Sequence, residues 1–168
     1  ILPIASDNEL DIYNILNSST DCDLIITTGG VSVGKYDLIQ KALENFSRNK
    51  TEFWKIAMRP GKPLLFSKIN KTPLIGLPGN PVSSGVCCLI FVNIAIRSML
   101  GDTNEFPIFE NATLNGELSQ NDQRFDFVRA NINYRSGNTY VTPIAKQDSS
   151  MITKFSYSDC LITREPFD

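Results

Sequence analysis

The sequence predicts an α/β domain over residues 1–101, followed by a small antiparallel sheet or barrel over residues 102–168. In the first part, short apolar runs rich in β-branched residues alternate with stretches of helical periodicity, which is typical of α/β folds. After Gly101 the helical patterns give way to alternating runs separated by turn residues, which favours a β-rich module. The 168 residues, of which 42% are hydrophobic, suffice for one sizeable core or two small ones.

The central element of the α/β part is the run from Leu24 to Thr28, interpreted as a buried parallel strand that ends at a glycine-rich loop. Ser6 and Asp7 are typical of a helix cap, and Gly101 is typical of the residue that follows a helix. Residues 49–51 are interpreted as a turn. Helices are expected at residues 6–17, 37–46 and 82–100, and strands at residues 24–28, 53–58, 64–67 and 73–77.

The C-terminal part has its turns at residues 121–122 and 136–138, where Asn, Asp, Ser and Gly gather. Between these turns apolar and polar residues alternate, as on a strand with one buried face. Strands are therefore expected at residues 108–114, 124–134, 139–144 and 160–164, with a short helix at residues 149–154.

The composition excludes several functional classes. A net charge of −2 and an isoelectric point near 5.2 argue against a partner such as nucleic acid or a membrane surface. The chain contains no histidine, which removes catalytic triads with histidine and imidazole metal sites. The apolar run over residues 86–96 is too short to span a bilayer and indicates a core helix.

The four cysteines, Cys22, Cys87, Cys88 and Cys160, have no CxxC spacing. This pattern favours buried, reduced thiols over a zinc or redox motif, and it fits a cytoplasmic location. The chain begins at Ile1 inside an α/β pattern, so we expect it to be a piece of a longer protein.

A glycine-rich loop follows the central strand, with Gly29, Gly30, Ser32 and Gly34 in the segment GGVSVG. In open α/β sheets ligands bind beyond the carboxyl ends of the strands, and glycines let the backbone approach them. The segment also fits GxxxxGK, but Tyr36 stands where a nucleotide-binding P-loop requires Ser or Thr for magnesium. A P-loop is therefore disfavoured, and an ordinary strand–helix turn remains the alternative to an anion site.

A second turn of the same layout, LPGNP, follows the strand at residues 73–77. Asn80 is a good helix N-cap and Pro81 a good first helical residue. The start of a helix carries partial positive charge and unpaired N–H groups, so the turn Pro78-Gly79-Asn80-Pro81 is a candidate oxyanion site.

Lys55, Arg59 and Lys62 form a cluster of cations around the turn RPGKP. On a strand Lys55 and Arg59 share a face, and Lys62 follows in the turn. The cluster is either a solvated charged face or a clamp for an oxyanion, since Arg offers a planar fork and Lys a point charge.

Three segments, GGVSVGKYD, FWKIAMRPGKPLLF and LPGNPVSS, resemble the MoeA family of molybdopterin molybdenumtransferases, which includes the gephyrin E domain. The motifs run in family order, and the resemblance continues through RFDFVRA and QDSSMITKFSYSDCLI. It implies a MogA-like molybdopterin-binding α/β domain, incomplete at its N-terminus, followed by a small C-terminal β-barrel.

The resemblance also implies a reaction, in which molybdate is inserted into adenylylated molybdopterin with release of AMP. A divalent cation, usually Mg²⁺, assists in the family, and a MogA-like adenylyltransferase precedes it in the pathway. Family members work as homodimers whose cleft is lined by both subunits.

For individual residues the resemblance implies that Asp37 is a catalytic group and metal ligand, and that Lys55 and Arg59 are catalytic. It places Lys62, Arg129 and Ser149 in substrate binding, together with the two turns described above. The chain departs from the family at Arg59, where Lys is common, and at Ser6-Asp7, where the family is more acidic.

Two alternatives remain open. A non-catalytic molybdopterin-binding or gephyrin-like scaffold module would share this fold, because fold alone does not fix function. A MogA-like or CinA-like relative would share only the glycine loop, and the PGNP turn with the C-terminal module argues against it.

Overall fold

The computed structural model describes residues 1–31, 38–46, 49–104 and 107–168. By its internal contacts the chain divides into two compact units. The first contains Ile1–Ile56 and Gly61–Gly79, and the second contains Ala57–Pro60 and Asn80–Asp168. The helix expected at residues 82–100 therefore belongs to the second unit. The sequence places the domain boundary at residue 101, whereas the division by contacts lies at residues 79–80.

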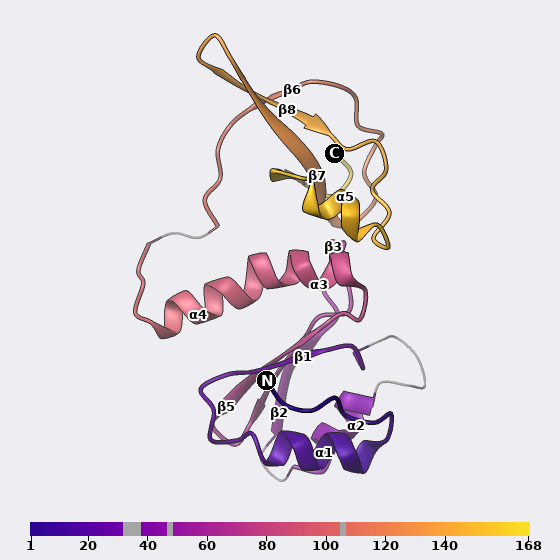
Figure 1. Cartoon of the computed structure of the whole chain (residues 1–168), viewed down its shortest axis with the longest axis vertical. Coiled ribbons are helices and arrows are strands. Elements are labelled where there is room, and N and C mark those ends of the chain that lie inside the picture. Colours follow the sequence, from indigo (N-terminus) through magenta and orange to yellow (C-terminus); the bar gives the residue numbers. More distant parts are fainter. Residues whose placement is uncertain (32–37, 47–48, 105–106) are drawn as a thin grey trace. The chain divides into compact units, whose positions relative to one another are not determined.

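The first unit is a four-stranded sheet with two helices on one of its faces (Figure 1). The strand order is β1-β5-β4-β2, with β1 and β5 parallel and the other two pairs antiparallel. Its elements are α1 (Glu9–Asn17), β1 (Ile25–Thr28), α2 (Leu38–Glu44), β2 (Asn49–Trp54), β4 (Leu65–Ile69) and β5 (Thr72–Leu77).

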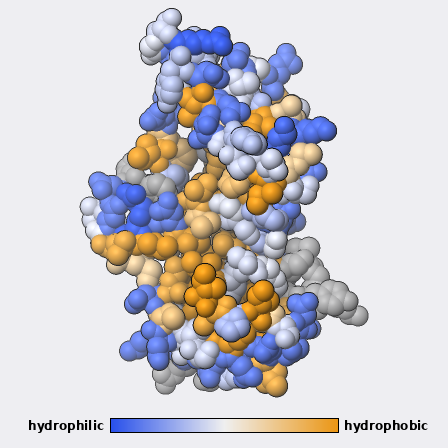
Figure 2. Space-filling view, in the orientation of Figure 1, coloured by the Kyte–Doolittle hydropathy of each residue, from blue (hydrophilic) through white to orange (hydrophobic). Residues whose placement is uncertain are grey.

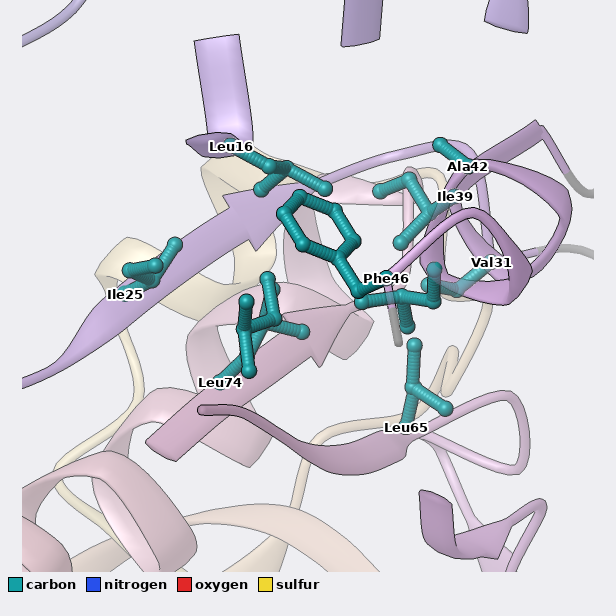
Figure 3. Packing of buried hydrophobic residues seen from close by; sticks show 10 residues of the cluster. Leu16, Ile25, Val31, Ile39, Ala42, Phe46, Leu65 and Leu74 are labelled. Carbon is teal, nitrogen blue, oxygen red and sulfur yellow. The ribbon is translucent and has the colours of Figure 1, made fainter. Parts of the chain in front are cut away.

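The core of the first unit lies between this sheet and the helices. Figure 3 shows Phe46 pointing into a group of aliphatic side chains from α1, α2 and the strands. The rings of Tyr13 and Phe46 lie 4.7 Å apart and join α1 to the end of α2. The labelled members of this cluster are Leu16, Ile25, Val31, Ile39, Ala42, Phe46, Leu65 and Leu74.

Four local predictions for the first unit are wrong. The strand expected at residues 53–58 is interrupted after Trp54, because Lys55 has φ +74°, and the next strand begins only at Met58. The parallel strand was expected to be buried, but β1 is at the sheet edge and Ile26 is 43% exposed. Residues 49–51 form the start of β2 instead of a turn, because they pair with β4. The cap of α1 is Asn8, whose side chain accepts from the Asp11 N–H at 2.8 Å.

The second unit contains a five-stranded sheet organised on the long strand β7 (Phe125–Arg135). One part of β7 pairs with β8 (Asn138–Pro143), and the other part pairs with β9 (Cys160–Arg164). The strands β3 (Met58–Arg59) and β6 (Thr113–Leu114) complete the sheet, and α5 (Ile152–Ser156) precedes β9.

Two predicted elements of this unit differ from the structure. The strand expected at residues 108–114 is reduced to β6, because Ile108 and Phe109 are 76% and 67% exposed and pair with no strand of the described chain. The short helix expected at residues 149–154 begins later, at Ile152. Strand β9 has the predicted bounds.

One long helix runs over Pro81–Met99 as α3 (Pro81–Cys87), a π-helical turn η1 (Cys88–Val92) and α4 (Asn93–Met99). Gly101 follows it with φ +78°, as expected for the residue after a helix. Figure 2 shows apolar residues gathered along this helix. The helix has 19 residues, and an 18-residue window in it has a mean hydropathy of 1.7, so by length and composition it could cross a bilayer, contrary to the sequence-based expectation. The core helix of a soluble protein has the same length and composition.

Candidate functional site

The two glycine turns lie side by side in the first unit. The Gly29 N–H donates to the Leu77 carbonyl at 3.1 Å, which joins the end of β1 to the end of β5. A Cβ added at Gly79 would lie 3.4 Å from the Gly29 Cα, so the two turns are in backbone contact. Gly29 and Gly30 have φ values of +80° and +69°, a backbone conformation that residues other than glycine rarely adopt. Turns of this kind can direct backbone amides towards an anionic ligand, although the Gly29 amide is already bonded to Leu77.

Other residues of the predicted glycine loop lie outside the described residues. They are Ser32, Gly34 and Asp37. Within the described ranges, no group of three or more Cys, Asp or Glu side chains is placed to hold a metal ion. The predicted roles of these loop residues therefore stay predictions.

Asn80 caps the long helix of the second unit, as the sequence predicts. Its side-chain oxygen accepts from the N–H groups of Val82 and Ser83 at 3.1 and 3.2 Å, and Pro81 occupies the first turn. Because Asn80 already occupies two of the orphan amides, the helix end would act on an anion mainly through its dipole.

Lys55 and Lys62 flank a tight turn at the end of the first unit. The Lys55 N–H donates to Leu64 O, and the Ile56 N–H donates to Lys62 O, both at 3.0 Å. Lys55 itself has φ +74°, a strained backbone conformation for a residue with a side chain. Both lysine residues are exposed, so their ammonium groups are placed at the surface of this turn.

Arg59 lies in the second unit, and carboxylates hold its guanidinium. Nε donates to Asp126 Oδ1 at 2.7 Å, and Nη2 contacts the other carboxylate oxygen of Asp126. Nη2 also donates to Asn121 at 3.1 Å, and Nη1 to Asp122 at 3.4 Å. The hydrogen bond with Asp126 raises the pKa of Arg59, since it favours the charged form.

Arg129 is the largest side chain buried in the second unit, with 1% of its surface exposed. Nε donates to Gln147 Oε1 at 3.2 Å and Nη1 to the Asp148 carbonyl at 3.1 Å. Among the described residues, no carboxylate forms an ion pair with it, although Asp148 lies near enough to act at longer range. Burial lowers the pKa of Arg129, and the Asp148 charge opposes this effect.

The loop that carries Ser149 covers this arginine. The side chain of Gln147 also bonds to the backbone of Arg129. Its oxygen accepts from the Arg129 backbone N–H at 3.0 Å, and its NH₂ group donates to the Arg129 carbonyl at 2.9 Å. The Asp148 carboxylate accepts from the Ser150 N–H and hydroxyl, both at 2.8 Å, and these bonds lower its pKa. Ser149 is half-buried in the same loop.

Sequence reasoning missed two residues that organise these groups. Gln147 is the first residue of the segment QDSS, but because glutamine carries no charge, no role was predicted for it. Asp126 sits in a strand of alternating pattern, where its partner lies far away in sequence. Each is recognised only when the pairing of β7 is known.

The predicted site residues fall into two groups by unit. The first unit holds Gly29, Gly30, Lys55, Lys62, Pro78 and Gly79, and the second holds Arg59, Asn80, Pro81, Arg129 and Ser149. Within the first unit the two glycine turns adjoin, and within the second Arg129 adjoins the loop of Ser149.

Two protein-family models match consecutive parts of the chain. Residues 2–98 match the model described as "Probable molybdopterin binding domain". Residues 111–167 match "MoeA C-terminal region (domain IV)". The matched ranges lie on either side of residue 101.

Curated relatives and solved structures resemble the chain along most of its length. A "Molybdopterin molybdenumtransferase" of Haemophilus influenzae is 34% identical over 168 residues, which cover 98% of this chain and 41% of that protein. A protein of the same name in Staphylococcus aureus is 32% identical over 142 residues, and the match covers 83% of this chain and 33% of that protein. The chain thus spans less than half the length of these relatives.

Among solved structures, the molybdopterin biosynthesis MoeA protein of Pyrococcus horikoshii has a TM-score of 0.74 at 23% identity, covering 98% of this chain and 39% of that chain. A molybdenum cofactor biosynthesis protein of Pyrococcus furiosus has a TM-score of 0.66 at 25% identity, covering 96% and 50%. These similarities show the fold.

Proposed function

Because this chain belongs to the molybdopterin-binding domain family and matches the MoeA C-terminal region, we propose that it is part of a molybdopterin molybdenumtransferase. The reaction inserts molybdate into adenylylated molybdopterin and releases AMP. Both substrates are anions, so the chain's part in the reaction is to bind, neutralise and orient negative charge.

The observation that carries this proposal is Arg129. A buried guanidinium is expensive to desolvate and is normally paired with a carboxylate. Arg129 is 1% exposed and is bound by a carbonyl and an amide oxygen, with no ion pair to a described carboxylate. An arginine held in this way by neutral acceptors is not neutralised by an adjacent carboxylate, so it contributes positive potential that favours an oxoanion bound nearby.

The glycine turns supply the second element of the proposal. Gly29 and Gly79 bring two strand ends into backbone contact, and no side chain of the described residues, apart from their chain neighbours, lies within 4 Å of the positions that their Cβ atoms would take. Backbone amides in such turns bind phosphate groups, so we assign them to the phosphate of the pterin substrate. Lys62 and Lys55, exposed on their turn, are assigned to molybdate.

Mg²⁺ belongs to the proposal through Asp37 alone. Among the described residues, no group of three or more Cys, Asp or Glu side chains is placed to hold a divalent cation, so we derive no step through the metal. Asp37→Asn keeps the size of the side chain and removes its charge. The proposal expects this variant, made in the full-length protein, to lose most of its magnesium-dependent rate of cofactor formation.

Three wider features are proposed with the function. The protein acts as a homodimer, it works in the cytoplasm, and a MogA-like adenylyltransferase supplies its pterin substrate. The second candidate is a non-catalytic scaffold module, which would not need a buried arginine without an ion-pair partner.

Binding measured by titration calorimetry tests the proposal. Wild-type chain, Arg129→Met and the matched control Arg135→Met, whose arginine is exposed on the same strand, are titrated with molybdate and with adenylylated molybdopterin. Hydrogen bonds to charged groups contribute about 1.5–3 kcal/mol, so Arg129→Met should weaken binding of at least one anion roughly 10- to 150-fold. If wild-type chain binds neither ligand, the enzyme assignment fails and the scaffold gains support.

A further inference from the structure

Strand β3 is the starting observation. It lies in sequence between β2 and β4, which are neighbours in the first sheet, yet it pairs with β7 of the second sheet. The register is parallel, with Met58 opposite Phe125 and Arg59 opposite Asp126. The Phe125 N–H donates to the Ala57 carbonyl at 2.9 Å. The tip of the turn that carries the predicted cation cluster is therefore built into the C-terminal sheet.

The side chains of Arg59 and Asp126 fix this pairing. Asp126 has a side chain that is 3% exposed, and both of its carboxylate oxygens contact the guanidinium of Arg59. Asn121, which is 4% exposed, adds a third acceptor at 3.1 Å. Paired hydrogen bonds between a guanidinium and a carboxylate fix orientation as well as distance.

We infer that Asp126 is a positioning residue and that Arg59 is the anchor it holds, so that Arg59 is not a ligand of the oxoanion. The anchor fixes residues 57–60, which directly precede Gly61 and Lys62 in the chain. The role of Lys62 rests on the proposed function, whereas the anchoring of residues 57–60 does not.

The electrostatics of Arg59 support this assignment. The Arg59 guanidinium donates hydrogen bonds to the carboxylates of Asp126 and Asp122. Any oxoanion that approached the guanidinium would therefore also approach these two carboxylates. Like charges repel at this distance, so these carboxylates oppose the binding of a second anion there. Arg129 donates only to neutral acceptors, and the Asp148 carboxylate acts on it only at longer range, so this opposition is weaker there.

The inference also explains why arginine is suited to position 59. A lysine ammonium is a point charge and meets one carboxylate oxygen at a time, whereas the guanidinium fork meets both oxygens of Asp126 and reaches Asn121. Arg59→Lys should therefore retain the charge and lose the anchor.

The experiment combines two measurements on the whole chain. Hydrogen exchange followed by mass spectrometry reports opening of residues 57–60 and of the Phe125 amide. Calorimetric titration with molybdate alone reports the anion site. The variants are Asp126→Asn, Arg59→Lys and the neutral pair Arg59→Gln with Asp126→Asn, in which a side-chain amide donates to an amide oxygen. Asp122→Asn is the matched control, because that carboxylate touches the same guanidinium from a side chain that is 40% exposed.

The anchor predicts that Asp126→Asn and Arg59→Lys speed exchange in this segment by roughly tenfold and weaken molybdate binding by a similar factor. The neutral pair should restore both, although it has no cation at position 59. Asp122→Asn should change exchange by less than about twofold, since exposed ion pairs contribute little.

Two results would overturn the inference. Unchanged exchange in Asp126→Asn and Arg59→Lys means that there is no anchor. Tighter molybdate binding by Asp126→Asn means that the freed Arg59 is a direct ligand. If the wild-type chain binds no molybdate, the proposed function fails instead, and the exchange measurements still decide the anchor.

Discussion

The ring of Phe155 in α5 lies against Gly85 in α3. A Cβ added at Gly85 would lie 2.5 Å from the Phe155 Cε1 atom, closer than real Cβ atoms approach. Glycine inside a helix is unfavourable by about 1 kcal/mol relative to alanine, so this position has a packing reason for its glycine. Within the second unit, α5 follows the loop of Ser149, and the Gly85–Phe155 contact therefore ties that loop to α3.

We expect Gly85→Ala to lower the free energy of unfolding by about 1 kcal/mol. Overpacking costs about 1–3 kcal/mol, and the better helix propensity of alanine returns part of this. The double variant Gly85→Ala with Phe155→Leu should lose less free energy of unfolding than the sum of the losses in the two single variants. Urea unfolding measures all three, with exposed Ser98→Ala on the same helix as the control. Additive single effects would show that the two residues do not interact.

Arg129→Met should leave the chain at least as stable as wild type. The substitution removes a buried charge that has no ion-pair partner among the described residues, so it avoids the cost of desolvating that charge and leaves no carboxylate unpaired. The Gln147 oxygen keeps a partner, because it also accepts from the backbone N–H of residue 129. Denaturant unfolding of Arg129→Met beside Arg135→Met measures this. A large loss of stability in Arg129→Met alone would show that the arginine serves the fold more than a ligand.

Leu65→Ala should be among the most destabilising single changes in the first unit. Leu65 is 0% exposed in the central strand β4, and such truncations cost about 2–5 kcal/mol through lost burial and a residual cavity. Leu10→Ala is the control, because Leu10 is 68% exposed and its truncation should change stability by less than about 0.5 kcal/mol. Equal effects of the two changes in urea unfolding would contradict the packing seen around β4.

Low pH should protonate Asp122 and so weaken its ion pairs with the neighbouring arginines. Hydrogen bonds from Arg124 lower the pKa of Asp122 from 3.8 to about 2. A carboxylate with a lowered folded-state pKa stabilises the fold above pH 3.8, and this contribution is lost as pH falls towards 2. Because the side chain is 40% exposed, the difference in melting temperature between wild type and Asp122→Asn should be small at pH 7 and should shrink further between pH 4 and pH 2. A difference independent of pH would exclude this carboxylate as its source.

The neighbouring thiols Cys87 and Cys88 should differ sharply in reactivity. Burial, with a smaller contribution from Cys88, raises the pKa of Cys87 to about 12, whereas Cys88 is exposed. Because the thiolate is the reactive form, a disulfide reagent at pH 8 should modify Cys88 quickly and Cys87 only on unfolding. Cys88→Ser should remove a fast-reacting equivalent, and Cys87→Ser should not. Rapid loss of the Cys87 thiol in native chain would contradict its burial.

The parts of the fold that sequence predicted are those set by local chemistry. Asn80 followed by Pro81 specifies a helix start, and the structure has this cap. The glycine turns at residues 29 and 79 adjoin because parallel strands end at the same edge of a sheet, which a pattern of strands already implies. Strand β9 was recognised with its bounds, since its apolar run stands between polar turns.

The parts that sequence did not predict depend on pairing between distant residues. Strand β3 has only two residues, Met58 and Arg59, too few for a periodic pattern. Its partner Asp126 lies far along the chain, so the cation at position 59 was interpreted as free for a ligand. Asn49–Thr51 has turn-like composition but is held as a strand by β4, which is a tertiary effect.

The path of the chain through β3 has a consequence for dissection. Ala57–Pro60 is grouped with the C-terminal half although the residues on both sides of it belong to the N-terminal half. A single break in the polypeptide at residues 79–80 therefore yields one fragment with an unmatched strand and another whose β7 has lost a neighbour. One cut therefore leaves neither half with all of its strand pairings, and separating the two units intact would require breaks on both sides of residues 57–60 as well.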